Sequence, residues 1–240
     1  MNRLQTRTIV ALAGVGVAAC ASSAPARTTP ATPAGAKAGF SASVDNPWLP
    51  LTPGTTLVYK GVKDKTTERD VFKVTHRTKV VGGVRCVVIN DRVYDANGRL
   101  SERTTDYYAQ DRKGSVWYFG EDTASLDASG RVTSTEGTWH AGVNGARPGL
   151  FMPAHPRVGE HHRQEFLGGH AEDQFRVVSL HSRVKVPYVR SRNALQTHEW
   201  TALEPGVLDA KYYVRGIGEV FEGSLKGPKE VFRLVAVKRG

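Results

Sequence analysis

Apolar and polar residues alternate along most of the chain with the two-residue period of a β-strand. The clearest segments are rich in β-branched and aromatic residues, which is typical of strands. These segments are residues 68–81, 84–94, 115–120, 175–189 and 230–238. No window keeps the 3.6-residue apolar period of an amphipathic helix, so we expect helices to be few and short.

Short turn sequences separate the predicted strands. They are Gly82-Gly83, Asp95-Ala96-Asn97-Gly98, Asp111-Arg112-Lys113-Gly114, Asp127-Ala128-Ser129-Gly130, Gly168-Gly169 and Pro205-Gly206. Strands joined in this way form an antiparallel meander, and with about ten or more of them a domain usually hides its sheet edges by curvature or closure. We therefore predict an all-β fold, an antiparallel meander that forms a barrel or a strongly curved half-barrel, lipocalin-like or lipoprotein-carrier-like.

Residues 1–19 predict a cleavable signal peptide. Arg3 and Arg7 precede an apolar run that ends at Ala19, within the roughly 7 to 15 residues of a secretory signal and short of the about 20 needed to span a membrane. The run ends in a lipobox, Val17-Ala18-Ala19-Cys20. We therefore predict that Cys20 carries a lipid such as palmitate and anchors the protein to the extracytoplasmic face of the cell membrane, or to an outer membrane if the host has one. The alternative is an ordinary signal peptide with a chance cysteine.

Residues 20–39 predict a disordered tether rich in Ala, Thr and Pro. After Cys20 the segment has no aromatic, large aliphatic or acidic residue, so it cannot bury enough apolar surface to offset its ordering entropy. A flexible coil of this length would hold the folded part roughly 25 Å from the membrane on average. Residues 40–240 then predict a single β-rich domain.

The formal net charge is +10, and cleavage of the signal would remove two arginines and leave +8. Net positive charge favours anionic partners such as lipid headgroups or acidic wall polymers. Lysines and arginines are nevertheless interspersed with acids, without a run of like charge, which predicts a mostly solvated surface. We expect a monomer whose partner is the membrane, and no nucleic acid partner, because the protein is exported.

Cys86 would be the only thiol left after lipidation of Cys20, so an intramolecular disulfide is excluded. It lies in the β-forming run VRCVVI, which predicts a small buried core residue rather than a nucleophile. Common catalytic signatures, including G-x-S-x-G, the P-loop and C-x-x-C, are absent from the sequence, and catalytic residues are not assigned.

Four stretches resemble a family of secreted, β-rich bacterial proteins, including lipoproteins. They are NPWLPLTPGTTLVYKG (46–61), DYYAQDRKGSVWYFGED (106–122), STEGTWHAGVNGARPGLFMPAHPRVGE (134–160) and KYYVRGIGEVFEG (211–223). The last stretch also resembles the closing hairpin of periplasmic curved-sheet proteins, some of which carry lipids or lipoproteins. The resemblance implies secretion and a β architecture, and it implies no particular activity.

The segment GEHHRQEFLGGHAEDQF (159–175) holds the densest group of chemically versatile side chains. If Gly168-Gly169 is a two-residue hairpin turn, Leu167 pairs with His170 and His162 pairs with Phe175, and alternation sorts the side chains onto two faces. The face expected to meet solvent has His161, Arg163, Glu165, His170, Glu172 and Arg176. The inward face has Glu160, His162, Gln164, Phe166, Ala171, Asp173, Phe175 and Val177.

The inward polar residues Glu160, His162, Gln164 and Asp173 are the candidate ligand or acid–base site. Buried polar groups are costly unless satisfied, so this patch suggests a pocket at a barrel mouth. Asp173 would orient His162, and Gln164 would donate to a ligand carbonyl. The alternatives are an internal hydrogen-bond cluster or a strand whose inner end reaches solvent.

The outward residues His161, His170, Glu165 and Glu172 are a candidate site for a divalent metal, because cross-strand Glu165 and Glu172 would repel without a cation between them. Their spacing matches no metal signature, and a charge ladder neutralised by Arg163 and Arg176 is the alternative. We therefore expect no cofactor, with a divalent metal as the alternative.

Two further features bear on a pocket. Trp117, Tyr118 and Phe119 lie in one strand, so alternation predicts that at least one faces outward or into a cavity. Packing in the core is the default for these side chains, and the aromatic wall of a ligand pocket is the alternative. The Gly- and Pro-rich stretch 137–159, which contains Trp139, predicts a long connection that acts as a lid or binding loop.

Three functions remain open from the sequence. The first is a lipid-anchored protein that binds or carries a small or lipidic ligand. The second is an envelope hydrolase or isomerase that uses His162 with Asp173 or Glu160. The third is a structural or interaction lipoprotein without a pocket. A cavity of several hundred Å³ would favour the first two, and a solid interior would favour the third.

Overall fold

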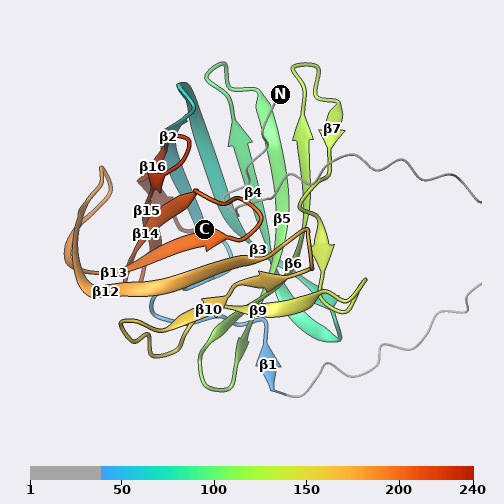
Figure 1. Cartoon of the computed structure of the whole chain (residues 1–240), viewed down its shortest axis with the longest axis vertical. Coiled ribbons are helices and arrows are strands. Elements are labelled where there is room, and N and C mark those ends of the chain that lie inside the picture. Colours follow the sequence, from blue (N-terminus) through green and yellow to red (C-terminus); the bar gives the residue numbers. More distant parts are fainter. Residues whose placement is uncertain (1–38) are drawn as a thin grey trace, which may run out of the picture.

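The alternating segments form strands throughout residues 39–240, the part of the chain that the computed structural model describes, and these residues contain no helix (Figure 1). The predicted signal peptide, Cys20 and almost all of the predicted tether lie outside the described residues. The strands are β1 (Phe40–Ser41), β2 (Thr56–Lys63), β3 (Thr66–Val81), β4 (Val84–Tyr94), β5 (Leu100–Asp111), β6 (Val116–Leu126), β7 (Val132–Ser134), β8 (Trp139–His140), β9 (Arg147–Met152), β10 (His161–Arg163), β11 (Glu165–Phe166), β12 (Asp173–Lys185), β13 (Arg190–Thr201), β14 (Leu208–Val214), β15 (Gly218–Lys226) and β16 (Glu230–Lys238). Nothing in residues 39–240 forms an apolar helix long enough to cross a membrane.

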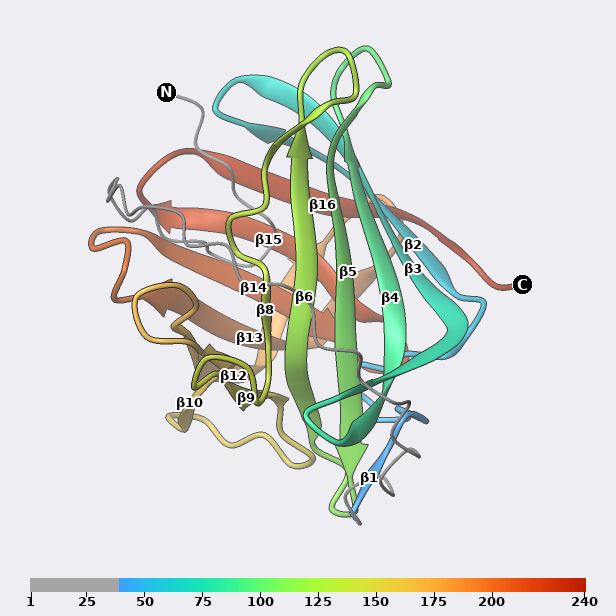
Figure 2. The same cartoon turned by 90° about the vertical axis from the view of Figure 1, so that its right-hand side faces the viewer.

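The predicted antiparallel meander is confirmed. Strands follow one another in the order β10-β12-β13-β14-β15-β16-β2-β3-β4-β5-β6-β9-β11, with β1 beside β5 and with β7 and β8 beside β6. All the strand pairs are antiparallel. Two walls result, β2–β6 and β12–β16, whose strands run across one another in Figure 2. The pairing of β16 with β2 joins the two walls along one side.

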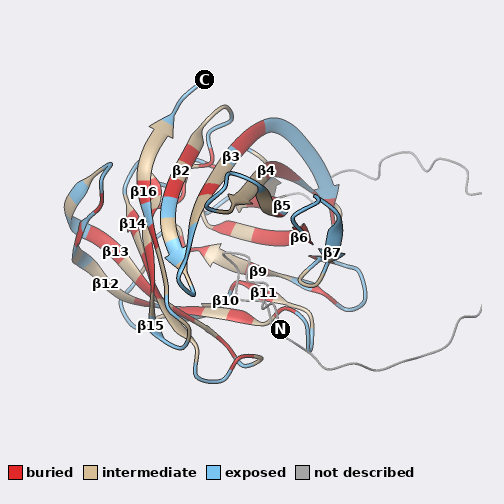
Figure 3. Cartoon of the chain, turned by 90° about the horizontal axis from the view of Figure 1, so that it is seen from above, coloured by how far each residue is buried: buried red, intermediate tan, exposed pale blue. Residues whose placement is uncertain are grey.

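The short segment 161–166 joins the walls on the other side. β10 pairs with β12, whereas β11, which follows directly in the chain, pairs with β9, so the chain changes partner at Gln164. Both edges of the sheet therefore end on one continuous stretch of chain, and the sheet nearly closes into the barrel visible from above in Figure 3. Gly149 of β9 permits this junction, because a Cβ there would lie only 2.2 Å from the carbonyl carbon of Gln164.

The main apolar core fills one part of the barrel and is covered by the segment 44–51. Trp48 and Leu51 of this segment are buried in the same cluster as Tyr118, Phe175 and Tyr213. The Asn46 side chain fixes the segment, since its amide donates to the carbonyl oxygens of Gly114 (2.8 Å) and Pro153 (3.1 Å). A second apolar cluster lies between β2, β15, β16 and the end of the β12–β13 hairpin.

Two irregularities overturn expectations from simple alternation. The stretch 137–159 is not an irregular loop, because it contains β8 and β9, which both pair with β6. A bulge between β5 and β6 at Tyr107/Tyr108 interrupts the alternation at Gly120, which has a φ of 136°. Tyr118 and Phe119 are consequently both buried, and Trp117 is half-buried.

Candidate functional site

Strand alternation separates acidic from basic residues on the β2–β5 wall. Neighbouring residues of opposite charge, such as Asp91-Arg92 and Glu102-Arg103, project to opposite faces. Glu102 is buried, whereas Arg103, the next residue, is exposed. The interspersed charges are therefore not a uniformly solvated surface, as the sequence suggested, but two faces of opposite sign.

The acidic face points into the barrel, where the opposite wall contributes more acids. The buried acids of the described chain are Asp70, Glu102, Asp106, Glu121, Glu165, Asp173, Glu199, Glu204 and Glu222. In the same residues, Lys211 is the only buried lysine or arginine. A protein of net positive charge thus encloses an acidic interior.

Lys211 on β14 is held between carboxylates of neighbouring strands. Its Nζ lies 3.0 Å from Oε2 of Glu199 on β13 and 3.5 Å from Oε1 of Glu222 on β15. Burial alone would lower the pKa of Lys211, but Glu199 and Glu222 raise it well above its usual value. Lys211 is therefore a charged ammonium inside the barrel at neutral pH.

Glu199 is the hub of this arrangement. Besides Lys211, its carboxylate accepts hydrogen bonds from the Thr197 hydroxyl (2.9 Å), the Tyr213 hydroxyl (3.4 Å) and the Gln164 amide (3.4 Å). Charge-assisted hydrogen bonds of this kind are among the stronger ones in proteins. The Gln164 contact links the barrel junction to Lys211.

The carboxyl groups across the barrel have pKa values near or above neutrality. Burial raises the pKa of Asp106 to about 8, with Asp91 adding to the shift, although the Tyr118 hydroxyl donates to it at 2.8 Å. Burial also raises the pKa of Glu102 to about 7 and that of Glu165 to about 8. Burial and the neighbouring Glu165 raise the pKa of Glu121 well above its usual value. Asp106, Glu121 and Glu165 are therefore mostly protonated at neutral pH, and Glu102 is roughly half protonated.

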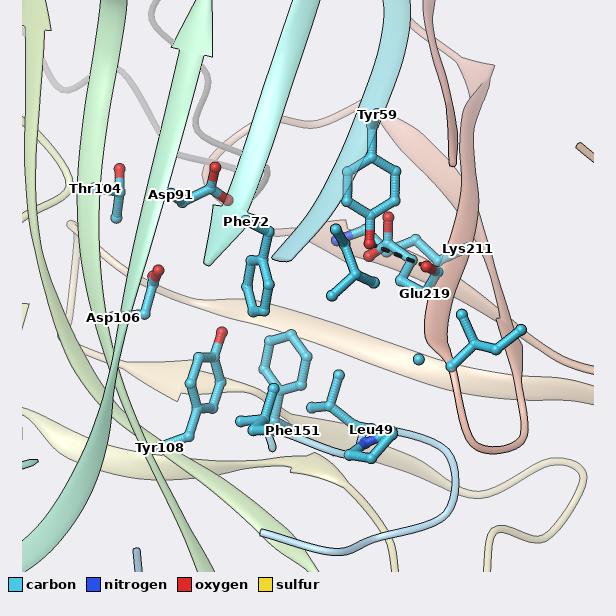
Figure 4. A pocket seen from close by; sticks show the side chains of 15 residues that line it. Leu49, Tyr59, Phe72, Asp91, Thr104, Asp106, Tyr108, Phe151, Lys211 and Glu219 are labelled. Carbon is cyan, nitrogen blue, oxygen red and sulfur yellow. Dashed lines mark hydrogen bonds between the residues drawn. The ribbon is translucent and has the colours of Figure 1, made fainter. Parts of the chain in front are cut away.

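A cavity lies between the acidic wall and Lys211 (Figure 4). Its volume is about 60 Å³. Its polar lining residues are Tyr59, Asp91, Thr104, Asp106, Tyr108, Lys211 and Glu219, and its apolar lining includes Leu49, Leu51, Leu57, Phe72, Phe151 and Ile217. Asp91 and Asp106 face Lys211 and Glu219 across it. The buried Oδ1 of Asp91 accepts no hydrogen bond from any described residue.

The cavity is smaller than the several hundred Å³ expected of a carrier. A water needs about 10 to 15 Å³ by this kind of measure, so the space equals a few waters. It suits a small polar group rather than a whole lipid. The Tyr59 hydroxyl, which donates to the Glu219 carbonyl at 3.0 Å, is already engaged at its rim.

The residues predicted as a ligand or acid–base site do not line this cavity. Nε2 of the half-buried His162 lies 3.7 Å from Glu160, and its ring packs beside Phe175. Gln164 and Asp173 are buried as predicted. The backbone N–H of Gln164 donates to the backbone carbonyl oxygen of Asp173 at 2.8 Å. The use of His162 with Asp173 in acid–base chemistry stays a prediction.

The structure does not bring the four candidate metal ligands together, and it contradicts the predicted position of Glu165. Because the chain changes partner at Gln164, Glu165 turns inward, is 1% exposed and accepts a hydrogen bond from Trp139 Nε1 at 2.8 Å. His161 and His170 remain exposed. Within residues 39–240 no group of three or more His, Cys, Asp or Glu side chains could hold a metal ion.

The turn of this hairpin also differs from the expectation. The pairing of His162 with Phe175 is confirmed, but Leu167 pairs with Ala171 rather than with His170. The turn is thus one residue longer than a two-residue hairpin. Glu172 approaches Arg163 at 3.7 Å, as the charge-ladder alternative predicted.

The remaining candidates pack in or near the core. Trp139 and Tyr118 are buried against each other with their ring centroids 5.4 Å apart, and Trp117 donates to Asp111 at 2.9 Å. None of the three lines the cavity, although Tyr108, which stacks on Tyr118, does. Cys86 is buried as predicted, and burial raises its pKa to about 12.

Sequence reasoning missed the residues that line the cavity. One signal was present, because acid–base neighbours such as Asp91-Arg92 within a strand must point to opposite faces. The position of Lys211 had no such signal. It lies more than a hundred residues away in sequence and meets the acids only through barrel closure.

Two solved structures are similar to this chain over most of its length. One is a protein of Bacteroides fragilis NCTC 9343, described as a predicted exported protein with a YMCC-like fold, with 13% identity, 80% of this chain and 99% of that chain covered, and a TM-score of 0.47. The other is a predicted lipoprotein of Parabacteroides distasonis ATCC 8503, with 9% identity, coverage of 80% and 98%, and a TM-score of 0.40. No family model and no curated protein matches the sequence. At these identities and scores, neither likeness bears on function.

Proposed function

We propose that the protein is a lipid-anchored, extracytoplasmic binding protein whose barrel interior takes the ammonium group of a small ligand. The observation that supports this most is the Asp91 carboxylate. It lines an interior cavity, and its buried Oδ1 has no hydrogen-bond donor among the described residues. A buried acceptor without a donor is costly, and a ligand that supplies the donor recovers that free energy.

The charges around the cavity favour a cation. Asp91, Asp106 and Glu219 line it, and the only lysine or arginine in the lining, Lys211, already pairs with Glu199 at 3.0 Å. A ligand carboxylate would add a further negative charge to this acidic interior. An ammonium group would donate to Asp91 and would stabilise the ionised form of Asp106.

The size of the cavity limits what enters. About 60 Å³ accommodates a group such as methylammonium, either as a free ion or as the end of a longer molecule. Leu49 and Leu51 of the covering segment form part of the apolar lining. The apolar part of a longer ligand would pack against these two side chains.

The lipobox supports the proposed location. Cys20 at the end of a signal-type apolar run predicts an anchored protein outside the cytoplasm. Metabolic labelling with a palmitate analogue tests this part separately. Equal labelling of wild type and Cys20→Ala would refute the anchor and leave the binding proposal untouched.

A melting experiment on the full-length protein in detergent tests the binding proposal. Methylammonium chloride and dimethylammonium chloride are compared with sodium chloride, sodium acetate and methanol at equal concentration. We expect the ammonium salts alone to raise the melting temperature, because a ligand that binds only the folded state stabilises it.

Asp91→Asn is the decisive variant, and Asp64→Asn is the matched control. Asp64 is an exposed acid in the β2–β3 turn with a φ of 46°, a conformation that asparagine tolerates well. The ammonium response should disappear in Asp91→Asn and persist in Asp64→Asn. A protein with no ammonium response, or with the same response in both variants, is not the proposed binding protein, and the structural function without a ligand would then stand.

A further inference from the structure

A groove lies on the outer side of the same wall, where β3 bulges away from β4. The ladder is regular up to the pair Val74–Ile89 and resumes at Thr78–Val87, so three residues of β3 stand opposite Val88 alone. The Thr75 hydroxyl donates to the Val88 carbonyl at 2.7 Å and accepts from the Arg77 backbone amide at 3.1 Å. These bonds fix the bulge and project Arg77 over the groove.

The groove is lined by donors and cations. Its volume is about 440 Å³, and its lining residues are Arg77, Thr78, Lys79, Val88, Asn90, Arg92, Thr105 and Tyr107. Arg77 Nη2 donates to the Asn90 side-chain oxygen at 3.2 Å, and Arg92 Nη1 donates to the backbone carbonyl of Asp91 at 2.6 Å. Both guanidinium groups are thus oriented by neutral oxygens rather than by carboxylates.

One carboxylate reaches this groove among the described residues. Asp122 of β6 lies 3.2 Å from Lys79 Nζ and accepts from the Tyr107 hydroxyl. On the outer face of β2–β5, the described residues from Lys60 to Tyr107 are otherwise basic, polar or apolar, and none is an acid. The three cations of the lining therefore exceed the nearby acid.

Folding alone gives no reason for this excess. Arg92 stands directly opposite Arg103 on β5, and like charges in this position destabilise a strand pair. An acid at either position would have stabilised the sheet. A repulsive pair beside a groove lined by oriented guanidinium groups is what recognition of an anion requires.

We propose that this groove binds the phosphate-bearing headgroup of an anionic lipid and so docks the β2–β5 wall onto the membrane. Guanidinium groups match phosphate oxygens with two parallel hydrogen bonds, and Lys79, Asn90 and Thr105 supply further donors. Free phosphate shares this chemistry. We commit to the lipid because the predicted Cys20 anchor holds the domain within reach of a membrane, where each basic residue near an anionic surface contributes about 1 kcal/mol.

This site is separate from the interior cavity. Asp91 lines the cavity and Arg92, the next residue, lines the groove, so the thickness of one sheet lies between the two ligands. Ammonium binding and headgroup binding therefore succeed or fail independently.

Calorimetry with soluble short-chain lipids tests the groove. The full-length protein in detergent is titrated with dihexanoyl phosphatidylglycerol, with dihexanoyl phosphatidylcholine, and with inorganic phosphate at equal ionic strength. We expect binding of the phosphatidylglycerol, weaker binding of phosphate and no measurable binding of the phosphatidylcholine. Affinity should fall with added salt, because exposed charges are screened.

The double variant Arg77→Gln/Lys79→Gln removes two exposed cations of the groove lining. It should lose roughly 25-fold in affinity for phosphatidylglycerol, about fivefold for each removed charge. Both side chains are exposed, so the fold should persist, and a melting measurement checks this. The control is Arg183→Gln/Arg192→Gln, two exposed arginines of the β12–β13 hairpin, which should bind like wild type.

Four outcomes would overturn the proposal. Equal binding of the two lipids would show that the headgroup charge is irrelevant, and equal losses in the two double variants would show that net charge, not the groove, attracts the lipid. Binding of phosphate without any advantage for phosphatidylglycerol would assign the groove to a free phosphate. An oligonucleotide that binds more tightly than the lipid would also contradict it.

Discussion

Asp91 and Arg92 are consecutive residues of β4 whose side chains lie on opposite sides of one sheet, Asp91 in the barrel cavity and Arg92 in the outer groove. Glu102 and Arg103 on β5 likewise lie on opposite sides of the sheet, with Glu102 buried and Arg103 exposed. Strand alternation thus converts a mixed sequence of acids and bases into an acidic lumen and a basic outer wall.

Stability should decrease as the pH rises from 5 to 9. Glu102, with a pKa of about 7, and Asp106 and Glu165, each about 8, hold protons in the folded state that they lose near pH 4 in the unfolded chain. Between these values the folded state binds more protons, so the free energy of unfolding falls by up to about 1.4 kcal/mol per pH unit for each group. Urea unfolding at pH 5, 7 and 9 measures it.

Glu165→Gln isolates one of these protons. The variant should flatten the pH dependence between 5 and 7 by about one proton, whereas the exposed Asp64→Asn should leave it unchanged. Carboxyls with lowered pKa values, such as Asp122, contribute only at more acidic pH and do not disturb this window. A stability that is flat or rising between pH 5 and 9 would refute the protonated interior.

The period of two in the β-branched and aromatic segments was sufficient to predict the all-β meander and the burial of Cys86. The pairing of His162 with Phe175 was predicted from a turn at Gly168-Gly169, and it is correct although that turn is one residue longer than expected. The same period also predicts that acids and bases lie on opposite faces, since consecutive residues such as Asp91 and Arg92 cannot share a face. The prediction of a mostly solvated surface considered only that acids and bases are interspersed, and it did not consider their alternation. The inward orientation of Glu165 could not be predicted from the local sequence pattern. Its orientation depends on the change of strand partner at Gln164, and that change depends on the close approach of Gly149, fifteen residues earlier.

The affinity for methylammonium should increase from pH 6 to pH 9. Asp106 has a pKa of about 8 and lines the cavity, so it acquires a negative charge over this range, while methylammonium keeps its positive charge over most of it. Asp106→Asn should bind with little pH dependence. Calorimetry at pH 6, 7.5 and 9 distinguishes the two proteins, and a parallel pH dependence in both would exclude Asp106 from the site.

Replacement of Lys211 by methionine should destabilise the protein by about 3 to 5 kcal/mol, because it leaves the buried Glu199 and Glu222 without their cation. The double variant Lys211→Met/Glu199→Gln should recover part of this loss, since it removes one of the uncompensated charges. Denaturant unfolding of the two single variants and the double variant measures the coupling. Additive losses would show that the pair does not act as an ion pair.

Gly149→Ala should open the barrel at its junction. The added Cβ would lie 2.2 Å from the Gln164 carbonyl carbon and 2.5 Å from the Arg163 carbonyl oxygen, so β9 must move away from the segment 161–166. We expect the free energy of unfolding to fall by about 2 kcal/mol or more, as at other overpacked sites. Amide hydrogen exchange should be faster than in wild type in β10 and β11 and unchanged in β4. Gly168→Ala is the control, because a Cβ there meets no atom within 4 Å.

Gly149→Ala should also weaken methylammonium binding, although Gly149 does not line the cavity. The junction holds Gln164 against Glu199, and Glu199 holds Lys211 at the cavity. Unchanged exchange in β10 and β11 would show that the barrel closes without this close approach.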